Sequence, residues 1–215
     1  MQRRGLSLFL AFLFAVLLTG PVMAQGTATA GTPTAEDEPE IDLLEFGAMA
    51  VATREFEQSG EDLDFTLLFT TGLAQFEDED AAADAFPQVA DLMLDLGPYD
   101  TLEVVELYAE LGDDQIFVYG EIESNGYTFN MGMLVVRNGA IFTMAGGLAY
   151  ETYDDMQDEL IELTEFLQEQ AEGANPETEE EYLDLMPEPG DLPRADEIDD
   201  PYVISKERVR FADES

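Results

Sequence analysis

Carboxylates are the side chains of this sequence with the widest chemical scope, because Asp and Glu together number 49 of its 215 residues. Two carboxyl groups in different environments can act as the acid and the base of a hydrolytic reaction. Several carboxylate oxygens that converge on one point can bind a divalent cation. With so many acids, some close pair is expected in any fold, and the EF-hand spacing is absent, so the pattern identifies neither catalytic residues nor metal ligands. A carboxylate-dependent hydrolase and a divalent-cation-binding protein therefore stay open as alternatives.

The residues that most other active sites require are missing. The chain has no His, no Cys and no Trp. These absences exclude Ser-His-Asp and Cys-His nucleophilic sites, thiol redox chemistry, disulfides and almost every zinc site. The single lysine, Lys206, lies near the C-terminus, a poor position for a buried Schiff-base amine. We therefore expect a non-enzymatic binding or structural module that uses no cofactor.

The net charge limits the partners of the protein. Its formal value is −41 at pH 7, with only eight Lys and Arg residues. Nucleic acids and anionic membranes bind positive surfaces, so the body of the protein is expected to bind neither. The acidity has two explanations: adaptation of the surface to high salt, where screening removes self-repulsion, or the binding of divalent cations. We favour salt adaptation, because the acidic runs lie where helix starts or a solvated tail are expected. These runs are Glu77 to Asp80, Glu177 to Glu181 and Glu197 to Asp200.

The first 24 residues have the pattern of a signal peptide. Arg3 and Arg4 precede an apolar run from Leu6 to Leu18, and a small-residue cleavage pattern ends at Ala24. The run is shorter than the roughly 20 residues that cross a bilayer as a helix. We expect a secreted or extracytoplasmic protein without membrane insertion after cleavage, with an unidentified protein or cell-surface component as its partner. The alternative is a membrane anchor formed by an uncleaved segment.

Composition divides the rest of the chain into three parts. Residues 25–40 are Thr, Ala, Gly, Pro and acid, and predict a disordered linker. Residues 41–173 have the composition of a single folded domain. Residues 174–215 are acidic and rich in Pro, and predict a largely disordered tail.

The stretch from Thr101 to Leu148 predicts the centre of the fold. Its runs of β-branched and aromatic residues are separated by Gly112-Asp113-Asp114, Asn125-Gly126 and Asn138-Gly139. Asn-Gly pairs favour the two-residue type I′ turns that join antiparallel strands. We therefore predict a four-stranded meander.

Two further strands and two helices complete the predicted α+β domain. Strands are expected at residues 48–56 and 65–71, the second one in the interior of the sheet because both of its sides are apolar. Apolar spacing of three and four predicts helices near residues 80–96 and 152–170. Pro87 predicts a kink in the first helix, or two short helices. The whole is an antiparallel sheet of five to six strands with both helices on one face. Gly146-Gly147 is interpreted as a tight turn, with an anion-binding turn as the alternative.

The element order resembles that of small exported α+β domains of the PsbP-like and LpqN-like groups. The segments ADAFPQVADLML and MGMLVVRNGAIFTMAGG carry the resemblance, which covers roughly residues 65–170 and is one of architecture without a specific motif. It implies a binding or assembly module, since members of such groups are mostly non-enzymatic. The chain lacks the lipobox of the lipoprotein members.

The end of the tail departs from its surroundings. Three cations alternate with other residues beside a β-prone run, and together they form a candidate partner segment: Tyr202, Val203, Ile204, Lys206, Arg208, Arg210 and Phe211. One hypothesis is that this segment adds a strand to an open sheet edge of its own domain or of a neighbouring copy, with weak self-association as a result. The alternative is a solvated chain end.

Overall fold

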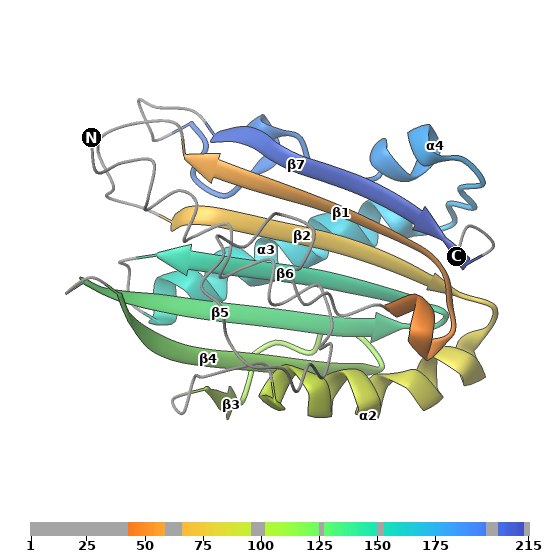
Figure 1. The fold of residues 1–215 in the computed structure, drawn as a ribbon, viewed down its shortest axis with the longest axis horizontal. Helices are drawn as coiled ribbons and strands as arrows, with labels where there is room; N and C mark the ends of the chain where they lie inside the picture. Colours follow the sequence, from red (N-terminus) through yellow and green to blue (C-terminus); the bar gives the residue numbers. More distant parts are fainter. Residues whose placement is uncertain are drawn as a thin grey trace, which may run out of the picture.

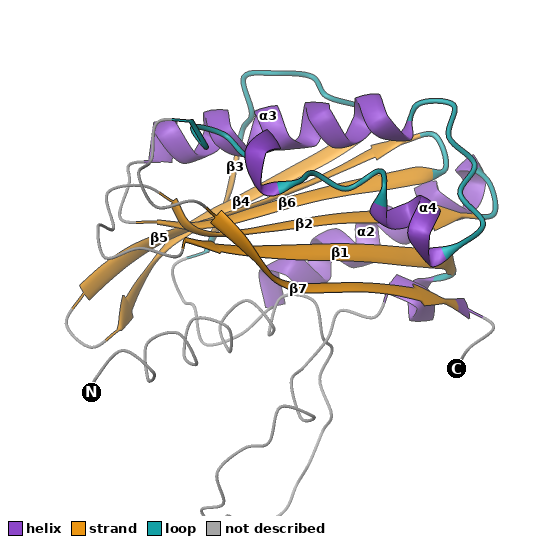
Figure 2. Ribbon diagram, turned by 90° about the horizontal axis from the view of Figure 1, so that it is seen from above, coloured by secondary structure: helices purple, strands orange, loops and turns teal. Residues whose placement is uncertain are grey.

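Apolar side chains on both sides of the long strands produce a sheet with two buried faces. The computed structural model describes residues 43–58, 66–95, 102–124, 127–149, 153–196 and 202–212. Neighbouring side chains of β4 lie in different apolar clusters, Val118 on one face and Phe117 on the other. A helix packs against each of these faces (Figure 2). Successive side chains of a strand point to opposite sides, so each face needs its own cover.

The described residues form one antiparallel sheet of seven strands (Figure 1). The strands follow the order β3-β4-β5-β6-β2-β1-β7 across the sheet. Their bounds are β1 Ala48–Gln58, β2 Thr66–Phe76, β3 Glu103–Val105, β4 Asp114–Ser124, β5 Tyr127–Asn138, β6 Ile141–Ala149 and β7 Tyr202–Phe211. The helical elements are η1 Leu43–Phe46, α2 Glu79–Asp95, α3 Tyr153–Ala171, α4 Glu179–Leu183 and η2 Pro189–Asp191. The α+β class, the antiparallel sheet, the four-stranded meander and the interior position of β2 are confirmed. The predicted five to six strands and two helices are too few, because β7 joins the sheet and α4 is a third helix among the described residues.

The turn between β5 and β6 differs from the predicted one. Asn138 pairs with Ile141, so the two loop residues are Gly139 and Ala140. Gly139 has a φ of 58°, and no other residue of this loop has a positive φ. A positive φ at the first loop residue alone is the pattern of a type II′ turn, in which Gly takes that position. The predicted type I′ turn at Asn138-Gly139 is therefore wrong by one residue. The predicted turn at Asn125-Gly126 lies outside the described residues.

The two long helices lie on opposite faces of the sheet, which corrects the prediction that they share one. Buried residues of α2, including Ala85, Val89 and Met93, join a cluster with Val118 of β4 and Phe142 of β6. The helix runs unbroken through Pro87, so the alternative of two short helices is wrong. The prediction failed because the period of an apolar stripe fixes which side of a helix is buried, not which face of the sheet it covers.

Helix α3 covers the other face with a narrow apolar stripe, as predicted. Met156, Leu160, Leu163 and Leu167 are fully buried. Gly132 of β5 lets this helix approach closely, because a Cβ there would lie 2.8 Å from Sδ of Met156. Gly146 and Gly147 lie inside β6, where they pair with β2 residues. Both interpretations of that glycine pair as a turn are therefore wrong.

The C-terminal part of the chain is folded onto the domain where the structure describes it. The segment after α3 forms α4 and η2, and the chain then completes the sheet as β7, antiparallel to β1. Tyr182, Met186, Leu192 and Tyr202 are buried. The domain boundary predicted at residue 173 and the predicted disordered tail are thus wrong for residues 174–196 and 202–212. Composition missed this order because four well-spaced apolar anchors suffice to hold a segment that is otherwise polar.

Candidate functional site

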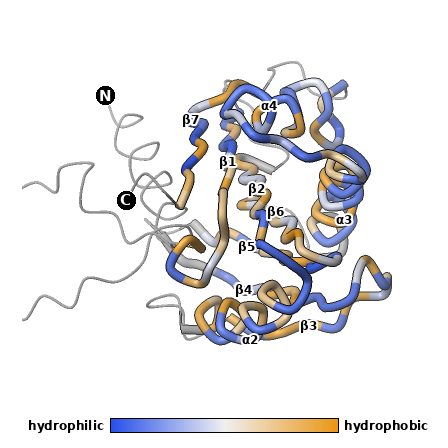
Figure 3. The backbone as a smooth tube through the Cα atoms, turned by 90° about the vertical axis from the view of Figure 1, so that its right-hand side faces the viewer, coloured by the Kyte–Doolittle hydropathy of each residue, from blue (hydrophilic) through white to orange (hydrophobic). Residues whose placement is uncertain are grey.

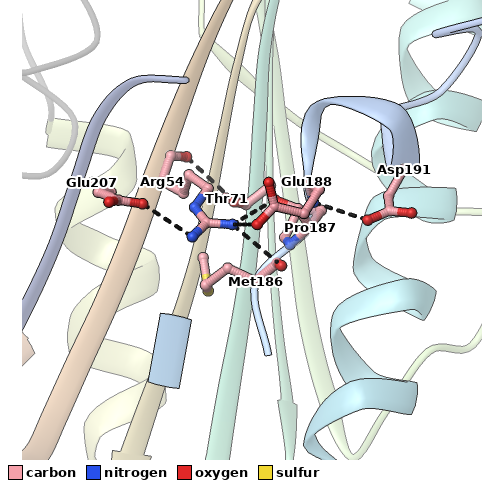
Figure 4. A network of polar contacts seen from close by, with 7 residues as sticks. All are labelled: Arg54, Thr71, Met186, Pro187, Glu188, Asp191 and Glu207. Carbon is pink, nitrogen blue, oxygen red and sulfur yellow. Dashed lines mark hydrogen bonds and ion pairs between the residues drawn. The ribbon is translucent and has the colours of Figure 1, made fainter. Parts of the chain in front are cut away.

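Arg54, in the middle of β1, joins the sheet to the C-terminal part of the chain. Its side chain is 5% exposed. One terminal nitrogen, Nη1, donates to the carbonyl oxygen of Pro187 at 3.0 Å and to Glu188 Oε1 at 2.9 Å. The other, Nη2, donates to Glu207 Oε2 of β7 at 3.0 Å. Figure 4 shows these acceptors on opposite sides of the guanidinium. One side chain therefore holds β1, the segment before η2 and β7 in fixed positions.

The contacts of Arg54 with Pro187, Glu188 and Glu207, which we call the clamp, require an arginine. A guanidinium offers five donors in a rigid planar fork, whereas a lysine offers a compact charge that cannot span acceptors on two sides. Burial of the cation is costly, and the two carboxylates compensate for that cost. Glu188 and Glu207 are themselves 65% and 44% exposed, so water still solvates them. Loss of the arginine would consequently leave buried carbonyl groups unsatisfied but would not bury an uncompensated negative charge.

Strand β7 presents two different faces. Tyr202 and Ile204 pack into the apolar cluster of α3, and Val209 and Phe211 into the cluster of α3 and α4. The pairing with β1 has an irregularity beside Ser205, where the strand contains one extra residue. After it, the side chains on the same face as Ile204 are those of Glu207, Val209 and Phe211. Hydrophilic residues fill the middle of the strand, from Ser205 to Arg208, and apolar residues lie towards both of its ends (Figure 3). The strand is held to the domain by one side and carries charge on the other.

The three cations of the strand share the other face of the sheet, where α2 lies. Lys206, Arg208 and Arg210 pair in register with Glu55, Thr53 and Val51 of β1. We call these three residues the cationic row. Lys206 Nζ lies 3.5 Å from Glu55 Oε1, with the lysine 45% exposed and the glutamate 9% exposed. Arg208 is exposed and Arg210 half-buried. The row thus combines an anchored lysine with an exposed arginine on an otherwise acidic protein.

Helix α4 and the residues around it hold in place the segment that contains Pro187 and Glu188, the acceptors of Arg54. Thr178 and Glu181 form a reciprocal capping box at its start, where the Glu177 and Thr178 contacts hold the pKa of Glu181 below its usual value. The hydroxyl of Tyr182 donates to Gln75 Oε1 of β2 at 2.6 Å. The ring of Tyr182 contacts Phe211 edge-on, with the centroids 5.7 Å apart. The segment after α3 is therefore bonded both to the sheet and to β7.

Arg137, the second arginine of the body, has a comparable role near the β5–β6 turn. Its Nε lies 2.7 Å from Asp114 Oδ2, and its Nη1 lies 3.4 Å from Asp113 Oδ2 and 4.0 Å from Glu79 Oε1. Its side chain is 9% exposed. Arg137 links the start of β4, the turn and the start of α2, so it is a structural residue.

The structure brings the predicted partner segment together on one strand. Tyr202 is buried, Ile204, Arg210 and Phe211 are half-buried, and Val203, Lys206 and Arg208 are exposed. Of the two hypotheses for this segment, addition to an open edge of its own domain is confirmed as the observed arrangement. Sequence reasoning missed Arg54 and Glu188 because a single arginine in a strand has no local pattern that reveals a distant acceptor.

The described residues contain neither a metal-binding cluster nor a membrane-spanning helix. No group of three or more Asp, Glu, His or Cys side chains is placed there to hold a metal ion. No helix in the same ranges is long and apolar enough to cross a membrane. The predicted signal peptide and linker lie outside them.

Comparisons with protein-family models, with curated proteins and with solved structures each gave no match.

Proposed function

We propose that this chain is an exported, non-enzymatic binding module whose binding element is the outer side of β7. The observation that carries the proposal is the position of this strand. It spans Tyr202–Phe211 and ends the order of described strands. The backbone groups on the outer side of an edge strand can pair with an extended segment of another chain. Ten residues offer enough of these groups for specific pairing.

The support beneath β7 suits it to binding. Arg54 holds its centre, and Tyr202 and Phe211 hold its two ends through aromatic contacts with Phe69 and Tyr182. A strand that is already ordered loses little conformational freedom when a partner pairs with it, which favours affinity. The resemblance to PsbP-like and LpqN-like domains also supports a binding or assembly role, because members of such groups are mostly non-enzymatic. Export is supported by the signal-peptide pattern of residues 1–24.

A carboxylate-dependent hydrolase is the rival function, and one surface deserves a test for it. An open hollow of about 540 Å³ beside α4 is lined by Glu179, Glu180 and Asp184. All three are exposed. A carboxyl that acts as a general acid near neutral pH needs burial or a like charge to raise its pKa. The shift at neighbouring Glu181 has the opposite direction. These features favour a solvated helix surface.

The proposal is tested by hydrogen exchange on the full chain in the presence of short extended peptides of varied sequence. We expect peptides that bind to slow the exchange of amides within residues 202–211 and to leave α3 unchanged. Failure of every peptide to protect β7 would overturn the proposal. So would a hydrolytic activity that Glu180→Gln or Asp184→Asn abolishes, because that result would establish the rival.

A further inference from the structure

We infer that the partner strand alternates acidic and apolar residues, and that the cationic row selects it. This inference rests on the proposed function and names the class of partner that the β7 edge takes. The row is an unusual use of scarce residues, because it contains three of the eight basic residues of a chain with 49 acids. All three lie on one face of a single edge strand.

The acidic part of the preference follows from cross-strand geometry. Side chains directly opposite one another on neighbouring strands have their Cβ atoms about 5 Å apart, and opposite charges in such pairs attract. A strand added beside β7 therefore places every second side chain against Lys206, Arg208 and Arg210. Aspartate or glutamate at those positions forms three opposed pairs, and a lysine or arginine there forms three repulsive ones.

The apolar part of the preference follows from the other face of β7. Val209 and Phe211 are half-buried on that face, beside buried Tyr182 and Met186. Ile204 is half-buried against the α3 cluster. The side chains of an added strand that point to this face extend an existing apolar layer and bury more of these residues. From Lys206 to Phe211, alternation of the two residue classes in the partner matches the two faces of β7, apart from Glu207, whose carboxylate is held by Arg54.

The same row makes a second copy a poor occupant. In an antiparallel pair of two β7 strands that overlaps these residues, cations of both copies lie directly or diagonally opposite one another. Like charges in these positions repel, and the acidic bodies behind them repel as well. The row therefore disfavours self-pairing while it attracts an acidic strand, which is how an interface discriminates against a wrong partner. The weak self-association expected from the sequence stays a prediction.

The inference is tested with the full-length protein and three peptides as long as β7, in which Val alternates with Glu, Gln or Lys. We expect the Val-Glu peptide to bind about tenfold more tightly than the Val-Gln peptide at low salt, and the Val-Lys peptide to bind most weakly. The differences should vanish near 1 M NaCl, where the Debye length is about 3 Å. Lys206 is the only lysine, so carbodiimide coupling should join it to a glutamate of the bound peptide.

Two double variants separate local charge from net charge. Arg208→Gln with Arg210→Gln removes two members of the row and should weaken the Val-Glu peptide about fivefold or more, with little effect on the Val-Gln peptide. Gln88→Glu with Gln170→Glu makes the same change in net charge on the exposed surfaces of α2 and α3. This control should leave the affinity of the Val-Glu peptide nearly unchanged.

The outcomes distinguish this inference from the proposed function. Equal binding of all three peptides, or an equal loss in both double variants, overturns the acidic preference and leaves the binding edge intact. Absence of any peptide on β7 overturns both. Protection of β7 that grows with protein concentration would identify a second copy as the occupant. Carbodiimide coupling of Lys206 to residues 36–42 in a monomer would identify the chain's own acidic segment as the occupant. Either result overturns the inference.

Discussion

The two edges of the sheet differ in almost every property that matters for pairing with another chain. At one edge, β3 is only three residues long, Glu103–Val105, and β4 is its one partner among the described strands. At the other edge, β7 has ten residues and is bound to the domain by Arg54 and by buried Tyr202. A very short edge strand offers few backbone groups to another chain, which is one way proteins protect an edge. The long edge is protected by charge instead, and charge can discriminate between partners where shortness cannot.

The two ends of the sheet also use different anchors. Arg54 connects β7 to segments distant in the sequence, so the order of this edge depends on contacts between residues far apart. Around Arg137 the anchors are Asp114, the first residue of β4, and Asp113 just before it; β4 is the strand next to the arginine's own. We therefore expect the β7 edge to open before the β4–β5 region does.

The largest effect is expected from Arg54→Ala. It removes the donors that satisfy Pro187, Glu188 and Glu207, and should lower the free energy of unfolding by about 3 kcal/mol, because buried carbonyl groups lose their partner and a cavity forms. Urea unfolding measures the loss. Hydrogen exchange should show β7 deprotected and β5 still protected. Arg54→Lys, which keeps the charge without the fork, should lose about half as much; full stability of either variant would contradict the clamp.

The matching change at the other end is Gly112→Ala. A Cβ there would lie 2.4 Å from the carbonyl oxygen of Arg137, and that oxygen already accepts a hydrogen bond from Asp113 N at 2.9 Å. The backbone must shift, so we expect a loss of about 2 kcal/mol in thermal or urea unfolding. Exchange should rise at the start of β4 and stay unchanged in β7. Equal deprotection of both ends would show that the edges are not independent.

A change in salt concentration acts on the whole acidic surface, including both edges of the sheet. If the 49 acids repel one another, the melting temperature should rise by several degrees between low and molar NaCl. Calcium at matched ionic strength should add nothing further. A melting temperature that ignores NaCl and rises sharply with stoichiometric calcium would establish a cation site and reverse our preference for salt adaptation.

The smallest effect concerns the segment that leads from β3 to β4. Tyr108 donates to Asp158 Oδ1 of α3 at 2.6 Å, and this hydrogen bond raises the pKa of Tyr108 to about 12. A raised tyrosine pKa contributes stability below pH 10, the ordinary value, and that contribution is lost as the pH rises towards 12. Tyr108 is 70% exposed, so the effect is small. Ultraviolet titration should show a component that ionises near pH 12 and that Tyr108→Phe removes; an unchanged titration curve would contradict the bond.

Local patterns predicted the elements that depend on local physics. The meander follows from β-prone runs between turn residues, and α2 and α3 follow from their apolar stripes. The faces on which the helices pack could not be predicted, because β4 and β5 are apolar on both sides. The contacts of Arg54 could not be predicted from the sequence either, since Glu188 and Glu207 lie more than a hundred residues from it along the chain. The β-prone run beside Lys206 was a genuine signal for β7, and only its pairing with β1 turns it into a site.

Amide hydrogen exchange along residues 202–211 of the full-length protein at low salt tests the central claim most directly. A docked strand with an open outer side should show alternate protection: amides that point to β1 exchange slowly, amides that point outwards exchange nearly as fast as those of an unstructured peptide, and the alternation shifts at the irregularity beside Ser205. Fast exchange at every position would show that β7 does not complete the sheet. Slow exchange at every position would show that its outer edge is already covered and cannot receive a partner.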